Sequence, residues 1–352
     1  MDSLTQFALG AAVGEATLGR KVGRRALLWG GICGTLPDLD VLVPFGDAVQ
    51  DFIFHRSASH SLFVLALLAP LVAYLITRIH PQTRPHYRGW LLLVFLALST
   101  HVLLDSLTVF GTQIFWPWGS DPVTWGTIFI IDPLYTVPLL VGVLAAWLLR
   151  SRLKGRQWNQ LGLTLSCIYL VWTVGAKVHV NDIADHQLAS DGQPPAQVVT
   201  MPTPFNSLLW RVVAVDQEAY RIGYYSLLQQ DKPIQFERFP RNLGVLAGLE
   251  DHEPVRKVKW FTKGFYAAEK RNGDILMIDL RAGLEPDYEY FFKVGELQDR
   301  QVRPVLSQRL PVQRSLARLP WLWDSLTEPR PILRGALFKT AELDTHTLLG
   351  PP

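Results

Sequence analysis

The sequence has very little cysteine. Only Cys33 and Cys167 occur in 352 residues, and each lies inside an apolar segment. Two cysteines placed in this way supply neither a disulfide framework nor a cysteine-rich zinc module. Cysteine usage therefore excludes a disulfide scaffold and leaves the redox compartment open.

The chain also lacks a strong excess of either charge. Its 34 Lys and Arg residues against 31 Asp and Glu residues leave a formal net charge of +3. The basic residues fall mostly in short clusters between apolar runs, which is typical of membrane topology rather than of nucleic-acid binding. Residues 1–19 carry no basic leader and no convincing cleavage site, so we expect them to be retained structure.

Long apolar runs dominate the chain up to about residue 180, and hydrophobic residues make up 49% of the whole. Four segments are each near the ~20 residues needed to cross a ~30 Å hydrocarbon core. They are residues 61–79, 89–110, 127–149 and 157–178. A fifth, residues 25–45, is long enough but carries acidic residues at its far end. Residues 2–18 predict a weaker apolar helix that packs within or against the bundle.

Two glycine pairs lie in these N-terminal segments, Gly10 with Gly14 and Gly30 with Gly34. A spacing of four residues allows close contact between helices. Chance occurrence in a glycine-containing helix is the alternative.

The basic residues predict the orientation of the bundle. They cluster at residues 20–25, 78–88 and 150–156, whereas the alternate loops, 46–60 and 111–126, contain only Arg56. The positive-inside rule makes the three basic loops cytoplasmic. Five crossings from that side would leave the chain after residue 180 outside.

The polar C-terminal half predicts β-structure. Residues 181–200 resemble a Pro-rich linker, and short strand-like runs follow, with Asn272-Gly273 a strong hairpin signal. We expect a small β-rich domain over residues 201–352, with an irregular or helical tail. The predicted fold is an α-helical polytopic membrane bundle (residues 1–180) followed by a small β-rich extracytoplasmic domain.

Four short motifs place ionisable residues in or beside the apolar segments. They are PDLD (37–40), HRSASHS (55–61), HVLLD (101–105) and IDP (131–133). At 1.5 Å per residue, His101 lies ~18 Å and Asp105 ~24 Å from the cytoplasmic end of their span. All four motifs map to the outer half of the membrane, where such residues usually face the bundle interior or a wet cavity.

Six of these residues predict a divalent-metal site. His101 and Asp105 lie four residues apart and share a helical face, and Pro37 breaks the helix before the first acidic pair. The predicted ligands are Asp38, Asp40, His55, His60, His101 and Asp105. Imidazole and carboxylate together suit Zn²⁺, Mn²⁺ or Fe²⁺, of which we expect Zn²⁺ or Mn²⁺. The pattern leaves open whether one ion or two would bind.

Three further residues are candidates for catalysis. Arg56 would neutralise an anionic oxygen, Ser59 would donate a hydrogen bond, and Asp132 lies at the same depth as the predicted ligands. Asp132 before Pro133 is equally typical of a helix N-cap. An ion-pair network, in which Arg56 neutralises a carboxylate, is the alternative to a metal site.

The site predicts a metal-dependent hydrolase that opens to the exported side, with a lipid-linked phosphoester as the favoured substrate and a peptide or amide bond as the other. Membrane lipid is the expected partner, and nucleic acid is not expected. A transporter would use the same carboxylates as a relay, but no polar residues continue into the cytoplasmic half. A structural or docking protein, in which the ion only locks the helices, is a third hypothesis.

The motifs also resemble a known family. The segment MDSLTQFALGAAVGEATLGRKVGRRALLWG, followed by PDLD, HRSASHS and HVLLDSLTVFGTQIFWPW, is similar to the YdjM-like family of LexA-regulated, metal-dependent hydrolases of the bacterial inner membrane. The resemblance covers roughly residues 1–180 and implies the same location and the same six metal ligands. Many members carry His where this chain has Gln6, which is a poor ligand. A site that uses this position would be weaker here, or the site would rely on the other six residues.

Overall fold

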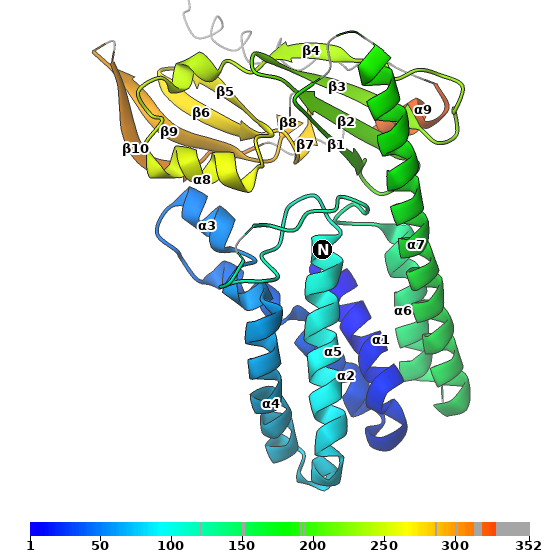
Figure 1. Ribbon diagram of the computed structural model, residues 1–352. Coiled ribbons are helices and arrows are strands. Elements are labelled where there is room, and N and C mark those ends of the chain that lie inside the picture. Colours follow the sequence, from blue (N-terminus) through cyan, green and yellow to red (C-terminus); the bar gives the residue numbers. More distant parts are fainter. Residues whose placement is uncertain are drawn as a thin grey trace, which may run out of the picture.

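The helices of the N-terminal region form a bundle, and a β-rich region lies at one end of it (Figure 1). This computed structural model describes residues 1–119, 121–149, 152–190, 192, 195–285, 287–299, 301–312 and 319–328. The helices of the bundle and its loops are α1 (Ser3–Val22), α2 (Arg24–Thr35), α3 (Ala48–Phe54), α4 (Leu62–Ile79), α5 (Tyr87–Ser106), α6 (Pro133–Leu148) and α7 (Arg152–Ser190). Short 3-10 helices η1 (Pro37–Leu42), η2 (Ala58–His60) and η3 (Pro81–His86) connect them.

Three helical segments are long and apolar enough to cross a membrane: Leu62–Ile79, Pro81–Ser106 and Leu153–Ser190. They coincide with three of the four spans expected from the sequence. The fourth, residues 127–149, contains the shorter apolar helix α6, because Asp132 accepts a hydrogen bond from the Leu134 N–H and Pro133 starts the helix there.

The predicted crossing over residues 25–45 is wrong as a single helix. Helix α2 has 12 residues and ends at Thr35, and Pro37 starts the 3-10 helix η1. At 1.5 Å per residue, α2 is only ~18 Å long, which is less than a ~30 Å hydrocarbon core. The break turns the acidic residues of the first motif toward the interior of the bundle.

Helices α1 and α2 form a tightly packed antiparallel hairpin in which the glycine pairs lie at the contact. A Cβ atom added at Gly10 would lie 2.3 Å from the Gly30 carbonyl oxygen, and one added at Gly34 would lie 2.5 Å from the Gln6 carbonyl oxygen. The backbones therefore touch, and no larger residue fits at these positions. The expected packing role of the glycine spacing is confirmed.

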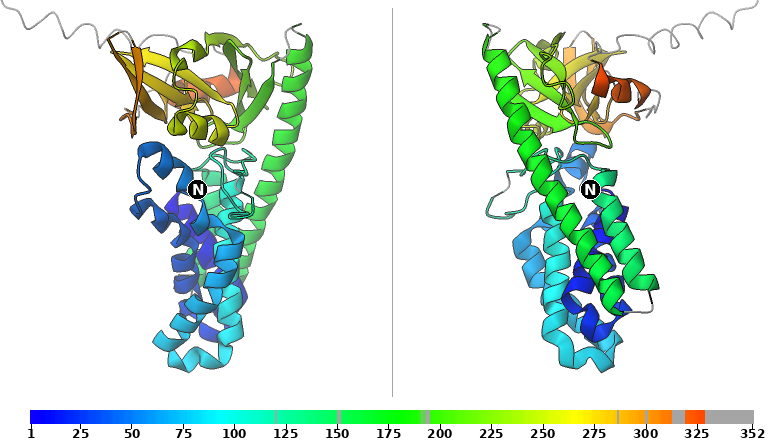
Figure 2. Two further views of the ribbon diagram at one scale, coloured as in Figure 1. Left: turned by 60° about the vertical axis from the view of Figure 1, so that its left-hand side comes forward. Right: turned by 90° about the vertical axis from the view of Figure 1, so that its right-hand side faces the viewer.

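The basic turns all lie at the end of the bundle that faces away from the β-rich region (Figures 1 and 2). Arg20 and Lys21 end α1, Arg24 and Arg25 begin α2, Arg78 ends α4, Arg84 and Arg88 lie in η3 and α5, and Lys154 and Arg156 lie in the first turns of α7. The bundle thus has one basic end and one end that carries the β-rich region.

The β-rich region contains two four-stranded antiparallel sheets that share a hydrophobic core. The first has the order β1-β2-β3-β4, with β1 (Gln197–Pro202), β2 (Leu209–Val215), β3 (Ala219–Ser226) and β4 (Glu237–Pro240). The second has the order β10-β9-β6-β5, with β5 (Tyr266–Arg271), β6 (Asp274–Asp279), β9 (Phe291–Gln298) and β10 (Gln301–Arg309). A two-stranded ribbon, β7 (Gly283–Leu284) and β8 (Asp287–Tyr288), and helices α8 (Glu253–Phe261) and α9 (Leu319–Thr327) complete it, with η4 (Leu243–Leu246) between β4 and α8.

The predicted hairpin is present, because β5 and β6 pair around Asn272-Gly273. The predicted linker, residues 181–200, overlaps the last ten residues of α7 and the first four of β1. Helix α7 continues there because Ala184 packs against Trp210 of the first sheet, in a cluster that Ile234 completes. Residues 313–318 and 329–352 of the predicted tail lie outside the described residues.

Helices α7 and α3 both hold the β-rich region on the bundle, and the loop between α5 and α6 also contacts it, since Trp260 donates to Asp121 at 3.0 Å. Besides α7, the short helix α3 carries Val49, Phe52 and Ile53 into a hydrophobic cluster with α8 and the second sheet. The Phe52 ring lies 4.8 Å from that of Phe261 and 5.0 Å from that of Phe110, between centroids. Because α3 lies in the loop between the PDLD and HRSASHS motifs, this contact places the β-rich region directly over the predicted site.

Candidate metal centre

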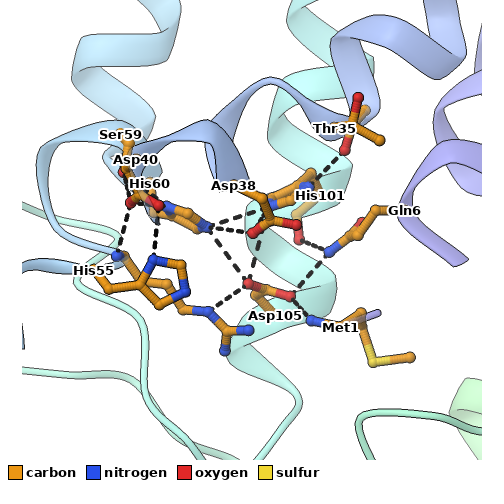
Figure 3. Close-up of polar contacts among 12 residues, drawn as sticks. Met1, Gln6, Thr35, Asp38, Asp40, His55, Ser59, His60, His101 and Asp105 are labelled. Atoms are coloured by element: carbon orange, nitrogen blue, oxygen red, sulfur yellow. Dashed lines mark hydrogen bonds and ion pairs between the residues drawn. The ribbon is translucent and has the colours of Figure 1, made fainter. Parts of the chain in front are cut away.

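Four of the six predicted ligands converge between η1, η2 and the C-terminal end of α5 (Figure 3). They are Asp38, His60, His101 and Asp105, and one donor atom from each lies within 4.8 Å of the others. The two histidines and Asp105 are fully buried, and the Asp38 side chain is 18% exposed. The broken helix after α2, the turn before α4 and one face of α5 thus meet at one point.

The distances within this group suit a small divalent ion. His60 Nε2 lies 3.2 Å from His101 Nε2, 3.6 Å from Asp38 Oδ1 and 3.5 Å from Asp105 Oδ2. His101 Nε2 lies 3.5 Å and 3.9 Å from the same two oxygens. Ligands bound tetrahedrally at about 2.0–2.1 Å lie about 3.4 Å apart. These five distances are therefore close to the spacing that such an ion requires.

Hydrogen bonds fix the orientation of both imidazole rings. His101 Nδ1 lies 2.7 Å from the carbonyl oxygen of Gly34, so Nδ1 donates its proton there and Nε2 faces the group. Ser59 donates its hydroxyl proton to Asp40, so the 2.9 Å contact between Ser59 Oγ and His60 Nδ1 requires His60 Nδ1 to donate. Both Nε2 atoms then present lone pairs to the same point, which is typical of histidines that bind a metal.

The carboxylate of Asp105 supplies the clearest sign that a cation belongs here. Its Oδ1 accepts hydrogen bonds from Gln6 Nε2, at 2.9 Å, and from the amino group of Met1. Its Oδ2 is buried and has no hydrogen-bond partner, although Arg56 Nε lies 2.9 Å away in an ion pair. A buried carboxylate oxygen without a hydrogen bond, facing two imidazoles and a second carboxylate, fits a bound cation.

Arg56 is held in a strained position beside the group. Its φ of 67° lies in the left-handed region, which costs a non-glycine residue about 1–3 kcal/mol. The Arg56 N–H donates to Asp40 at 3.1 Å, and the Arg56 carbonyl accepts from the Gln113 N–H at 3.0 Å. Its guanidinium lies 4.8 Å from the ring centroid of Phe110, under the β-rich region.

Asp40 and His55 lie outside the four-residue group and contact each other. His55 Nδ1 is 2.7 Å from Asp40 Oδ1, and the side chains are 27% and 7% exposed. Asp40 Oδ2 lies 3.6 Å from His60 Nδ1. These two residues stay predicted ligands, but the geometry places them as a neighbouring carboxylate–imidazole pair that supports His60 through Ser59.

Asp132 is not brought to this group by any contact within the described part of the chain. Its Oδ1 accepts from the Leu134 N–H at 3.0 Å, and its Oδ2 accepts from the Tyr169 hydroxyl at 2.7 Å. The Tyr169 hydroxyl oxygen in turn accepts from the Ser207 hydroxyl at 2.9 Å. The contacts of Asp132 are those of a helix cap that ties α6 to α7 and to the β-rich region.

Sequence analysis named Gln6 only as a departure from the family's His, and it did not identify Gly34 as a residue that orients a ligand. Gln6 binds Asp105, and the Gly34 carbonyl binds His101, so the α1–α2 hairpin supports two ligands of α5. The close glycine spacing signalled the packing of this hairpin, but no sequence pattern linked it to the site. The departure at Gln6 leaves an amide that donates to a ligand in place of an imidazole.

Comparisons with known proteins match the bundle. The family model described as "YdjM inner membrane protein" matches residues 1–180. "Inner membrane protein YbcI" of Escherichia coli (strain K12) is 31% identical over 168 residues, which cover 44% of this chain and 95% of that protein. No solved structure matches. The matched region contains every residue of the four-residue group.

Proposed function

Because the chain belongs to the YdjM inner membrane protein family, we propose that it is a multi-pass inner-membrane hydrolase that depends on a divalent metal. The convergence of Asp38, His60, His101 and Asp105, with an unbonded buried oxygen on Asp105, is the observation that carries this proposal. Two imidazoles and two carboxylates suit Zn²⁺ or Mn²⁺. A bound ion of this kind lowers the pKa of a water molecule and polarises a scissile bond.

The two ends of the bundle support an extracytoplasmic position for the site and for the β-rich region. The three turns at one end carry Arg and Lys, and the four-residue group lies at the other end beneath the sheets. The positive-inside rule assigns the basic turns to the cytoplasm. The site then opens to the outer face of the membrane.

The residues around the group supply the remaining functions of a hydrolase. Arg56, with both Nε and Nη1 buried and without hydrogen bonds, offers positive charge to an anionic oxygen of a substrate. His55 is the most exposed member of the site and its ring is held by Asp40, so this pair would transfer a proton to or from the reacting groups. An anionic, lipid-linked phosphoester fits the charge and the position at the membrane surface.

Elemental analysis of detergent-purified protein tests the metal site directly. We expect about one Zn²⁺ or Mn²⁺ per chain in the parent, and its loss in a His101→Ala/Asp105→Ala variant. The matched control is Asp182→Ala/His186→Ala, which removes the same residue types at the same spacing from an exposed pair on α7. If parent and both variants hold equal metal, or none after incubation with Zn²⁺ and Mn²⁺, the proposal fails.

A structural ion is the second candidate function. Four protein ligands fill a tetrahedral site, whereas catalytic zinc sites keep a position open for water. Turnover separates the two candidates, since both predict metal binding. We would assay phosphoester, lipid and amide substrates with the metal-loaded parent and a His55→Ala variant. Turnover that is lost in His55→Ala supports the hydrolase, whereas a metal-dependent melting temperature without turnover supports the structural ion.

A further inference from the structure

A polar cavity lies at the basic end of the bundle, remote from the candidate metal centre. Its volume is about 510 Å³, and it lies between the α1–α2 turn and the first turns of α7. Arg20, Arg24, Arg25 and Arg156 line it, and Glu15 is the one carboxylate among its described lining residues. Pockets of this size hold small ligands or lipid headgroups.

The arginines of this cavity outnumber the carboxylates among its described lining residues. Arg156 has a buried Nε without a hydrogen-bond partner among the described residues, and four arginines face a single lining carboxylate, Glu15. The guanidinium of Arg24 lies 5.3 Å from the ring centroid of Trp147, on α6. A buried, unpartnered donor and an excess of positive charge favour an anionic ligand.

The backbone adds to this preference. Helix α2 has 12 residues, and no side chain caps its N-terminus, where Gly23 has a φ of 66° and open space around it. The free N–H groups and the positive end of the helix dipole therefore face the turn that carries Arg24 and Arg25. Forked guanidinium donors and a helix N-terminus together match the several oxygens of a phosphate group.

We infer that this arginine cavity binds a phosphate group, supplied by an anionic phospholipid headgroup or by free phosphate. The inference does not depend on the hydrolase proposal, because the cavity contains none of the four metal-group residues. Basic pockets between membrane helices at a cytoplasmic surface are suited to acidic lipid headgroups. The lining comes from two turns that are far apart in sequence, so bound phosphate would also join α1 and α2 to α7.

The test compares two variants that remove equal charge from the same end of the bundle. Arg24→Gln/Arg25→Gln/Arg156→Gln empties the cavity of three guanidinium groups. Arg78→Gln/Arg84→Gln/Arg88→Gln removes three exposed arginines of the α4–α5 turn, outside the cavity. Full-length protein in nanodiscs of mixed phosphatidylglycerol and phosphatidylcholine is analysed by native mass spectrometry for retained phosphatidylglycerol. A parallel titration in phosphatidylcholine alone measures the binding of inorganic phosphate.

We expect at least about a tenfold loss of retained phosphatidylglycerol in the cavity variant and less than about twofold loss in the control. Loss of inorganic phosphate binding alone, confined to the cavity variant, would assign free phosphate as the source. Equal effects of the two variants, or no effect of either, would overturn the inference. If the Gln variant does not fold, Arg24→Lys/Arg25→Lys/Arg156→Lys keeps the charge, and the same selective loss is expected because Lys lacks the forked donors.

Discussion

Two buried Asp–Arg pairs behave differently in this molecule. In the β-rich region, Arg281 donates to both oxygens of Asp279, at 2.9 and 2.8 Å, and both side chains are 2% exposed. In the bundle, Arg56 approaches only one oxygen of Asp105, and that oxygen has no hydrogen bond. The first pair satisfies its carboxylate, whereas the second leaves it facing further ligands.

The difference separates a structural pair from a binding site. A buried carboxylate held by two guanidinium hydrogen bonds needs nothing more. Asp105 is surrounded by Asp38, two imidazoles, Arg56 and the amino group of Met1, and its Oδ2 still has no hydrogen bond. A metal ion would supply the partner that Asp105 Oδ2 lacks, whereas both oxygens of Asp279 already accept hydrogen bonds.

Removal of each carboxylate tests this comparison most strongly. Asp279→Ala leaves a buried arginine unpaired, so we expect a loss of about 3–5 kcal/mol in the free energy of unfolding, with metal content unchanged. Asp105→Ala should abolish metal binding. Thermal unfolding and elemental analysis of both variants measure the two effects. Loss of metal from Asp279→Ala would show that the two pairs are not independent.

The next prediction tests whether the packing of the α1–α2 hairpin supports the candidate metal centre. Gly10→Ala places a Cβ against the Gly30 carbonyl, and we expect a loss of about 1–3 kcal/mol together with weaker metal binding, because the hairpin carries Gly34 and Gln6. Gly175→Ala on α7 is the control, since nothing lies within 4 Å of its added Cβ. That variant should be neutral or slightly stabilising. Equal destabilisation by both changes would contradict the packing argument.

Ser59→Ala tests the orientation of His60. Without the hydroxyl between Asp40 and His60 Nδ1, we expect metal affinity to fall by about 10–100-fold, as for other groups that orient ligands. Ser57→Ala is the control in the same loop, because Ser57 donates only to the Phe54 carbonyl, at 2.6 Å. Competition with a chelator measures the affinity. Unchanged affinity in Ser59→Ala would assign that serine to the loop alone.

Asp132→Ala should have the smallest effect on stability and metal content, and it tests whether Asp132 belongs to the site. Loss of the α6 cap predicts about 1 kcal/mol of destabilisation, with metal content unchanged. Asp132→Asn, which keeps a capping oxygen, should recover most of the stability. A large loss of turnover in Asp132→Asn, without loss of stability, would restore Asp132 as a catalytic residue.

Much of the bundle could be predicted from the sequence, because hydropathy and helical spacing are local properties. The apolar runs of α4, α5 and α7 and the shared face of His101 and Asp105 follow from residues close together in the chain. The sequence also placed the motifs at a similar depth in the membrane, and the structure brings Asp38 and His60 to the face of α5 that carries His101 and Asp105.

The remainder depends on contacts between distant segments. The 3-10 helices η1 and η2 decide whether the Asp40 side chain points toward the four-residue group or toward His55. The geometry of such short turns cannot be read from the spacing of hydrophobic residues in the sequence. The support of His101 by the Gly34 carbonyl spans 67 positions, and the Asp47–Ser307 hydrogen bond spans 260. The packing of α3 on the β-rich region likewise joins residues that share no local pattern.

Helix α7 and helix α3 attach the β-rich region to the bundle at two separate points, so the chain forms a closed mechanical loop. The 39 residues of α7 give a rod about 58 Å long. One residue inserted in this rod would turn the sheets by about 100° and pull them from α3. An insertion of seven residues would nearly restore the rotational orientation of the sheets but would move them about 10 Å further from the bundle. The length of α7 is therefore constrained, because the sheets must also stay in contact with α3.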